Sequence, residues 1–181
     1  LAENISEHCG NSLARIGVEN MNTGLNRDSR LVLIHPPAIS KRYLKTKFMP
    51  YGMAVLYSFL KEHSIPVVQF DFLMEYLFES PDDIDFYNPE KTFSEEEFFA
   101  ALNGRASHPG IGNFVEKYCS RVVQNSGMYA FSIVAYHQFW AGLLMAARIR
   151  RNNPDAVIVF GGPFITIKPV ESFAPYGVAD Y

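Results

Sequence analysis

The chain has 181 residues, of which 48% are hydrophobic, so it is long enough for one domain with a sizeable apolar core. Its net charge is -3 and no basic stripe emerges, which argues against nucleic acid as a partner. No apolar run is long enough to cross a bilayer, and the polar N-terminus is unlike a signal peptide. We therefore expect no membrane partner and a cytoplasmic location.

The first strong structural signal lies near residue 31. Residues 1–30 hold few large apolar side chains and are expected to form a leader that is partly helical or irregular. The run at 31–35 is apolar, rich in branched residues and ended by Pro36 and Pro37. Such a run predicts a strand buried on both faces, as parallel sheets require.

The next predicted elements are a helix over 52–61, with an apolar stripe, and a strand over 65–72. Residues 73–127 exceed a usual crossover, and their acidic first half indicates a solvated insertion. Within it, Ser94 followed by Glu97 matches a capping box and predicts the start of a helix. The acidic residues lack the regular loop spacing that hard cations need, so no metal site is expected there.

The rest of the chain alternates between helical and strand patterns. We predict a helix over 111–123, a strand over 128–134, a helix from Phe139 to Ala147, a strand over 156–160, a short helix around 170–173 and a fifth strand beginning at 177–181. Strands alternating with helices predict an α/β fold with a doubly wound, Rossmann-like, five-stranded parallel sheet and an extra helical insertion.

Ligands of such sheets bind beyond the carboxyl ends of the strands, which directs attention to four loops. After the first strand, Pro36 and Pro37 remove backbone donors, which disfavours a phosphate cradle. No GxGxxG or Walker pattern occurs, so classical nucleotide sites are disfavoured. A stiff, apolar loop suits the flat face of a large ligand, although the prolines can equally serve only to end the strand.

Two other loops carry weaker signals. Gly161 and Gly162 follow the fourth strand and let a backbone pass close to a ligand or to the next helix, or form a tight turn. Ser132 lies in an otherwise apolar strand, where its hydroxyl needs either a backbone partner or a ligand group. No catalytic triad can be assembled, so no catalytic residue is predicted. Cys9 and Cys119, without a CxxC partner, are expected to be ordinary reduced thiols.

The loops together resemble the cobalamin-binding domain of radical S-adenosylmethionine enzymes. That family shows a strand ending in Asn-Pro-Pro, a Pro-x-Gly segment opening the first helix, a Ser in the third strand, Gly-Gly after the fourth and Val-Asp-Tyr in the fifth. The similar segments here are LVLIHPPA, PYGMAVLYSFLKEHSIPVVQFDF, MYAFSIVAYHQFWAGLLMAARIRRNNPDAVIVFGGPF and VADY. They cover about 31–72 and 128–181 in the family's order.

The resemblance implies a flavodoxin-like fold with a corrinoid, cobalamin, at the carboxyl edge of the sheet. Ser132 and the paired glycines would line the channel of its nucleotide tail. The prolines with Tyr136 would approach the corrin face, and the segment at Tyr51 would shape the rim. The cofactor-binding residues implied are Pro36, Pro37, Tyr51, Gly52, Ser132, Tyr136, Gly161, Gly162 and Pro163.

The sequence departs from one branch of cobalamin domains. Domains of the methionine-synthase type carry Asp-x-His-x-x-Gly after the first strand, where the histidine ligates cobalt. The segment around His35 lacks both the Asp and the Gly. His35 is thus a weak candidate cobalt ligand that can instead bond only to backbone, and the radical-enzyme branch implies a base-off corrinoid without a protein histidine.

The family's catalytic half is absent from this sequence, which lacks a Cys-x-x-x-Cys-x-x-Cys motif. Residues 31–181 are therefore expected to be a cobalamin-binding domain cut before a radical S-adenosylmethionine domain that would hold the 4Fe-4S cluster and S-adenosylmethionine. Alone, the fragment would be inactive. The alternative is a degenerate domain of the same fold that serves in regulation or partner docking. Receiver-like and flavin-binding functions fit less well, because the first loop lacks their acidic or phosphate-binding residues.

Overall fold

The computed structural model describes residues 30–37, 51–73, 75, 94–105, 109–122, 127–167 and 176–180. These residues form an α/β fold around a parallel sheet in the order β2-β1-β3-β4. Its strands are β1 (Arg30–His35), β2 (Val67–Asp71), β3 (Gly127–Ser132) and β4 (Val157–Gly161). The predicted α/β class and parallel sheet are confirmed, and the four apolar runs predicted as strands all lie in the sheet.

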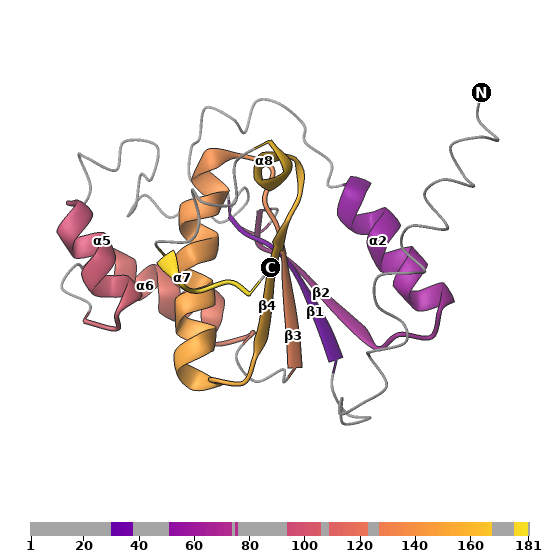
Figure 1. The fold of residues 1–181 in the computed structure, drawn as a ribbon, viewed down its shortest axis with the longest axis horizontal. Helices are drawn as coiled ribbons and strands as arrows, with labels where there is room; N and C mark the ends of the chain where they lie inside the picture. Colours follow the sequence, from indigo (N-terminus) through magenta and orange to yellow (C-terminus); the bar gives the residue numbers. More distant parts are fainter. Residues whose placement is uncertain are drawn as a thin grey trace.

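Five helices have both of their ends among the described residues. They are α2 (Tyr51–Glu62), α5 (Glu95–Leu102), α6 (Pro109–Cys119), α7 (Tyr136–Asn152) and the short α8 (Pro163–Thr166). Figure 1 shows α2 on one side of the sheet and α7 on the other, with α5 and α6 beyond α7. The predicted leader falls outside the described residues except for Arg30, which opens β1, and so does the short helix expected around 170–173.

The prediction of five strands is wrong for the described chain, because residues 177–180 do not form a strand. They do lie beside β4, where the amide of Asp180 donates to the carbonyl of Ile158 at 2.8 Å. The Asp180 carboxylate accepts from the amide of Ile158 at 2.7 Å and from Arg150 at 2.6 Å. A side chain thus takes one of the edge bonds that a paired strand would supply.

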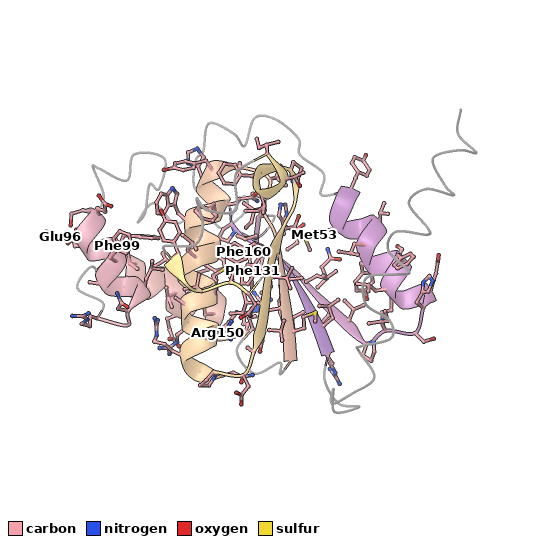
Figure 2. All side chains as sticks on the ribbon, viewed as in Figure 1. Met53, Glu96, Phe99, Phe131, Arg150 and Phe160 are labelled. Atoms are coloured by element: carbon pink, nitrogen blue, oxygen red, sulfur yellow. The ribbon has the colours of Figure 1, made fainter. Side chains whose placement is uncertain are left out.

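The two faces of the sheet are covered to different extents. Alternate residues of β1 point to opposite faces, so Val32 and Ile34 join the core with α7, whereas Leu33 packs with Met53 of α2. Phe131 and Phe160 meet edge to face on the α7 side, with ring centroids 5.1 Å apart (Figure 2). The α7 core is much the larger of the two.

Helices α5 and α6 belong to that larger core. The capping box predicted at Ser94 is confirmed: its amide donates to the Glu97 carboxylate at 2.7 Å, and the Glu97 amide donates to its hydroxyl at 3.2 Å. Phe98 packs edge to face on Trp140 of α7, and Tyr118 and Cys119 of α6 are buried. Residues 73–127 are the segment predicted to be an insertion. Their described helices, α5 and α6, therefore pack with α7 on its side of the sheet.

Candidate functional site

The strand order creates a switch point between β1 and β3. The chain leaves β1 toward α2 on one face and leaves β3 toward α7 on the other face. Such divergence opens the carboxyl edge of a parallel sheet between the two strands, where ligands of α/β proteins bind. The loops singled out from the sequence therefore border the expected ligand edge.

Ser132 and Gly161 lie side by side at this edge. They end β3 and β4 and are register partners in the parallel ladder. Because side chains alternate along a strand, both face away from Phe131 and Phe160, toward the side of the sheet that carries α2. A Cβ added to Gly161 would meet no described atom within 4 Å. Among the described residues, the space over Gly161 is therefore open, next to a serine hydroxyl.

The sheet face leading to Ser132 is only partly covered. Helix α2 packs chiefly on β1 and β2. On β3 and β4, the residues that face the α2 side remain partly exposed, in contrast to the buried α7 side; they are Met128, Ala130, Ser132, Val157, Val159 and Gly161. Buried parallel sheets are normally covered on both faces, and the described residues cover this half-face only in part.

Gly162 differs from its neighbour. Its φ is +101°, and an added Cβ would lie 2.6 Å from the carbonyl oxygen of Ile133. The close approach lets the Ile133 carbonyl accept from the amide of Phe164 at 3.1 Å, while the Ile133 amide donates to Gly161 at 2.8 Å. Gly162 is therefore needed for the turn that joins β4 to α8, and Pro163 occupies the first position of that helix.

The two prolines after β1 are buried. Pro36 lies against α7, since its Cγ is 3.7 Å from the position of a Cβ added to Gly142. The same Cβ would be 3.1 Å from Ile133, so the glycine lets α7 approach the sheet closely. Pro36 thus helps to fix α7 on the ends of β1 and β3, and a contact of either proline with a corrin ring stays a prediction.

His35 is 2% exposed and both of its ring nitrogens are bonded. Its Nδ1 lies 3.1 Å from a carboxylate oxygen of Asp71 at the end of β2. Its Nε2 lies 2.9 Å from the amide nitrogen of Gln138 on α7. Gln138 is also 2% exposed, and these two are the buried polar residues of the described chain.

The bonds of Gln138 define the protonation of His35. The Gln138 side-chain oxygen accepts from the amides of Val134 at 2.8 Å and Ala135 at 3.3 Å. Its NH2 group therefore faces Pro36, whose carbonyl accepts at 3.0 Å, and the ring of His35. Because that NH2 group can only donate, Nε2 of His35 must be the acceptor, and the neutral ring carries its proton on Nδ1 and donates it to Asp71.

The two hydrogen bonds of His35 bear on its candidacy as a cobalt ligand. A histidine binds a metal through an unprotonated ring nitrogen. In His35 the unprotonated Nε2 accepts from Gln138, and the other nitrogen donates to Asp71. Coordination through His35 would break the Gln138 bond inside the core. His35 instead ties the end of β1 to the end of β2 and to α7.

The remaining predicted site residues lie on helix starts. Tyr51 and Gly52 open α2 and are exposed, Tyr51 by 71%. Tyr136 opens α7 and is 47% exposed, and its ring contacts Trp140 and Phe164 at centroid distances of 5.5 and 6.0 Å. The structure brings Ser132 and Gly161 together directly and places these helix starts after the switch-point strands.

Sequence reasoning missed Asp71 and Gln138 as partners of His35. They lie 36 and 103 residues away from it along the chain. A signal for Gln138 exists, because a glutamine three residues after a helix start reaches back to the preceding backbone, as Glu97 does at α5. Asp71 is also an acidic residue at the carboxyl end of a strand, where ligand edges form.

Neither a metal-ligating cluster nor a membrane-spanning helix occurs within the part of the chain that the structure describes. There, no three His, Cys, Asp or Glu side chains gather closely enough to hold a metal ion. No described helix combines the length and apolar character that a bilayer crossing requires. Comparison with known proteins gave no matching family model, no matching curated protein and no matching solved structure.

Proposed function

We propose that this chain is a corrinoid-binding module that takes up cobalamin at the carboxyl edge of its sheet. In a longer protein it would present the cofactor to a downstream radical S-adenosylmethionine domain with an iron–sulfur cluster, for methyl transfer by the cobalt centre. The observation that carries the proposal is the space over Gly161, which no described atom fills, beside Ser132 on the partly covered sheet face. The sequence resemblance assigns the nucleotide tail to these same residues.

Three further observations support the proposal. The strand order β2-β1-β3-β4 matches the first four strands of a flavodoxin-like order. The segment at 178–180, which belongs to the resemblance, lies beside β4 and bonds to it through Asp180 without forming a strand. The first loop holds two prolines and its histidine is engaged on both nitrogens, which suits a corrinoid whose cobalt receives no protein histidine at this position.

Cobalamin uptake can be tested on the purified chain. The protein is mixed with hydroxocobalamin, desalted and examined by visible spectroscopy, with circular dichroism to show that it is folded. We expect corrinoid absorbance to elute with the protein. A folded protein that elutes without colour would contradict the proposal. Electron paramagnetic resonance of the reduced Co(II) form should lack nitrogen splitting from a protein histidine.

A second candidate function, docking of a protein partner without a cofactor, is favoured by α2. The first ten residues of this helix carry no charge, and large apolar side chains are exposed on it, including Val55 by 68% and Phe59 by 49%. An apolar helix left uncovered is typical of an interaction surface. The desalting experiment separates the candidates, because a docking module would not retain the corrinoid.

A further inference from the structure

The ends of β1, β2 and β3 are joined by one hydrogen-bond network, formed by the buried His35 and Gln138 and the partly exposed Asp71. The side chain of Gln138 by itself bridges two loops, because it donates to Pro36 after β1 and accepts from Val134 after β3. His35 extends the connection to Asp71 on β2. The network therefore crosses the switch point, where the two loops diverge.

We infer that Gln138 is a positioning residue that sets the separation of the β1 and β3 loops at the ligand edge. This inference concerns the site of the proposed function and rests on it for its effect on ligand affinity. Gln138 is buried and points into the network, so it acts on a ligand only through the loops it holds. A loop held in place before binding loses less freedom when a ligand arrives.

The geometry leaves no spare bond in the Gln138 side chain. Its two N–H groups serve Pro36 and His35, and its oxygen serves two backbone amides. An apolar side chain of similar length would fill the space but leave the amides of Val134 and Ala135 without their acceptor. The effect of such a change should therefore concentrate in the β3 loop.

The test compares Gln138→Met with Gln69→Met, which makes the same change on β2, outside the network. Amide hydrogen exchange is measured by NMR, and each rate is corrected for the change in global stability obtained from urea denaturation. In Gln138→Met we expect the amides of Val134 and Ala135 to exchange at least about tenfold faster after this correction. The same two amides should be unchanged in Gln69→Met.

A conservative variant and the histidine ring provide a second readout. The Gln138→Glu variant loses the donor to the Pro36 carbonyl but keeps an oxygen for Val134 and Ala135, so the slow exchange of these two amides should be retained. A carboxylate can only accept, so Nε2 of His35 should gain a proton, which 15N chemical shifts of the ring report. In the wild type the same spectrum should show a neutral ring with its proton on Nδ1.

Two results would overturn the inference: unchanged exchange of Val134 and Ala135 in Gln138→Met, or a wild-type His35 that carries its proton on Nε2. Ligand affinity is a separate arm, in which Gln138→Met should bind hydroxocobalamin about tenfold more weakly than Gln69→Met. Equal affinities would refute the effect on the ligand. A wild type that retains no corrinoid would refute the proposed function, while the exchange and ring spectra still decide whether Gln138 positions the loops.

Discussion

Gly161 and Gly162 are neighbours in the chain but have different reasons to be glycine. Gly161 faces a space beside Ser132 that no described atom fills, whereas Gly162 adopts a positive φ directly against the backbone of Ile133. The sequence resemblance assigned both residues to the tail channel. The geometry separates a position where an added side chain would meet no described atom from one that the turn itself requires.

Alanine substitutions should reveal this difference in stability. Gly162→Ala places a Cβ 2.6 Å from the Ile133 oxygen at a φ that L-residues rarely adopt, so we expect a loss of at least about 2 kcal/mol in the free energy of unfolding. Gly161→Ala should change it by less than about 1 kcal/mol. Urea denaturation measures both. Equal losses in the two variants would show that the turn is misassigned.

Cys119 illustrates how burial controls a single side chain. It is 1% exposed at the end of α6, and burial raises the pKa of its thiol to about 12. Arg148 and Arg151 oppose this shift but do not cancel it. A thiol so protonated is a poor nucleophile, which agrees with the prediction of an ordinary reduced cysteine. Burial also raises the pKa of Tyr129 and the pKa of Tyr176.

These shifts predict a loss of stability in alkali. The ordinary pKa of a thiol, 9.0, applies to the unfolded chain, while the folded pKa of Cys119 is about 12. The contribution of the protonated Cys119 thiol to the free energy of unfolding is complete below pH 9. It declines as the pH rises toward 12, because the unfolded state releases the proton first. In that pH window, the thiol alone should lower the free energy of unfolding by on the order of 1 kcal/mol per pH unit. Urea denaturation from pH 8 to 11 measures it, and Cys119→Ala should reduce the slope. An identical slope in the variant would contradict the burial effect.

At the scale of elements, patterns among neighbouring residues predicted more of the helices and strands than contacts between distant residues could. The capping box at Ser94 formed as expected because all its partners lie within four residues. Short, branched apolar runs gave the four strands. Helix α8 was not predicted, because four residues are too few for a periodic pattern and its start depends on the contact between Gly162 and Ile133.

The expected fifth strand failed for a similar reason. Its residues bond to β4 mainly through Asp180, whose side chain bridges Ile158 and Arg150. A strand predicted from composition is assumed to pair through its backbone along several residues. Among the described residues of 176–180, only the Asp180 amide makes such a bond. The sequence contains no sign that a side chain would replace the ladder.

Removing this carboxylate should loosen the segment from β4. In Asp180→Ala, Arg150 and the Ile158 amide lose an acceptor that lies partly exposed, so we expect about 1–2 kcal/mol less stability and faster exchange of the Ile158 amide. Asp155→Ala, at an exposed position after α7, is the matched control. Thermal unfolding and hydrogen exchange are the measurements. If the Ile158 amide exchanges as slowly in Asp180→Ala as in Asp155→Ala, the Asp180 carboxylate does not hold residues 177–180 against β4.

For the whole molecule, the parallel sheet and its layers followed from the alternation of apolar patterns. The resemblance selected Ser132 and Gly161 for the candidate site, and the ladder places these two residues side by side. It could not give the Asp71–His35–Gln138 network, whose members meet only after three strands and α7 are assembled. The uneven covering of the sheet is also a property of the assembled layers, with α7, α6 and α5 on one side and α2 on the other (Figure 1).

The most direct test of the account fills the space over Gly161. Hydroxocobalamin affinity is measured by spectroscopic titration for the wild type, for Gly161→Leu and for Gly112→Leu, a glycine of α6 that also has no described atom within 4 Å of an added Cβ. We predict that Gly161→Leu remains folded and loses corrinoid binding, whereas Gly112→Leu binds like the wild type. A Gly161→Leu protein that binds as tightly as the control would contradict a corrinoid site beside Ser132.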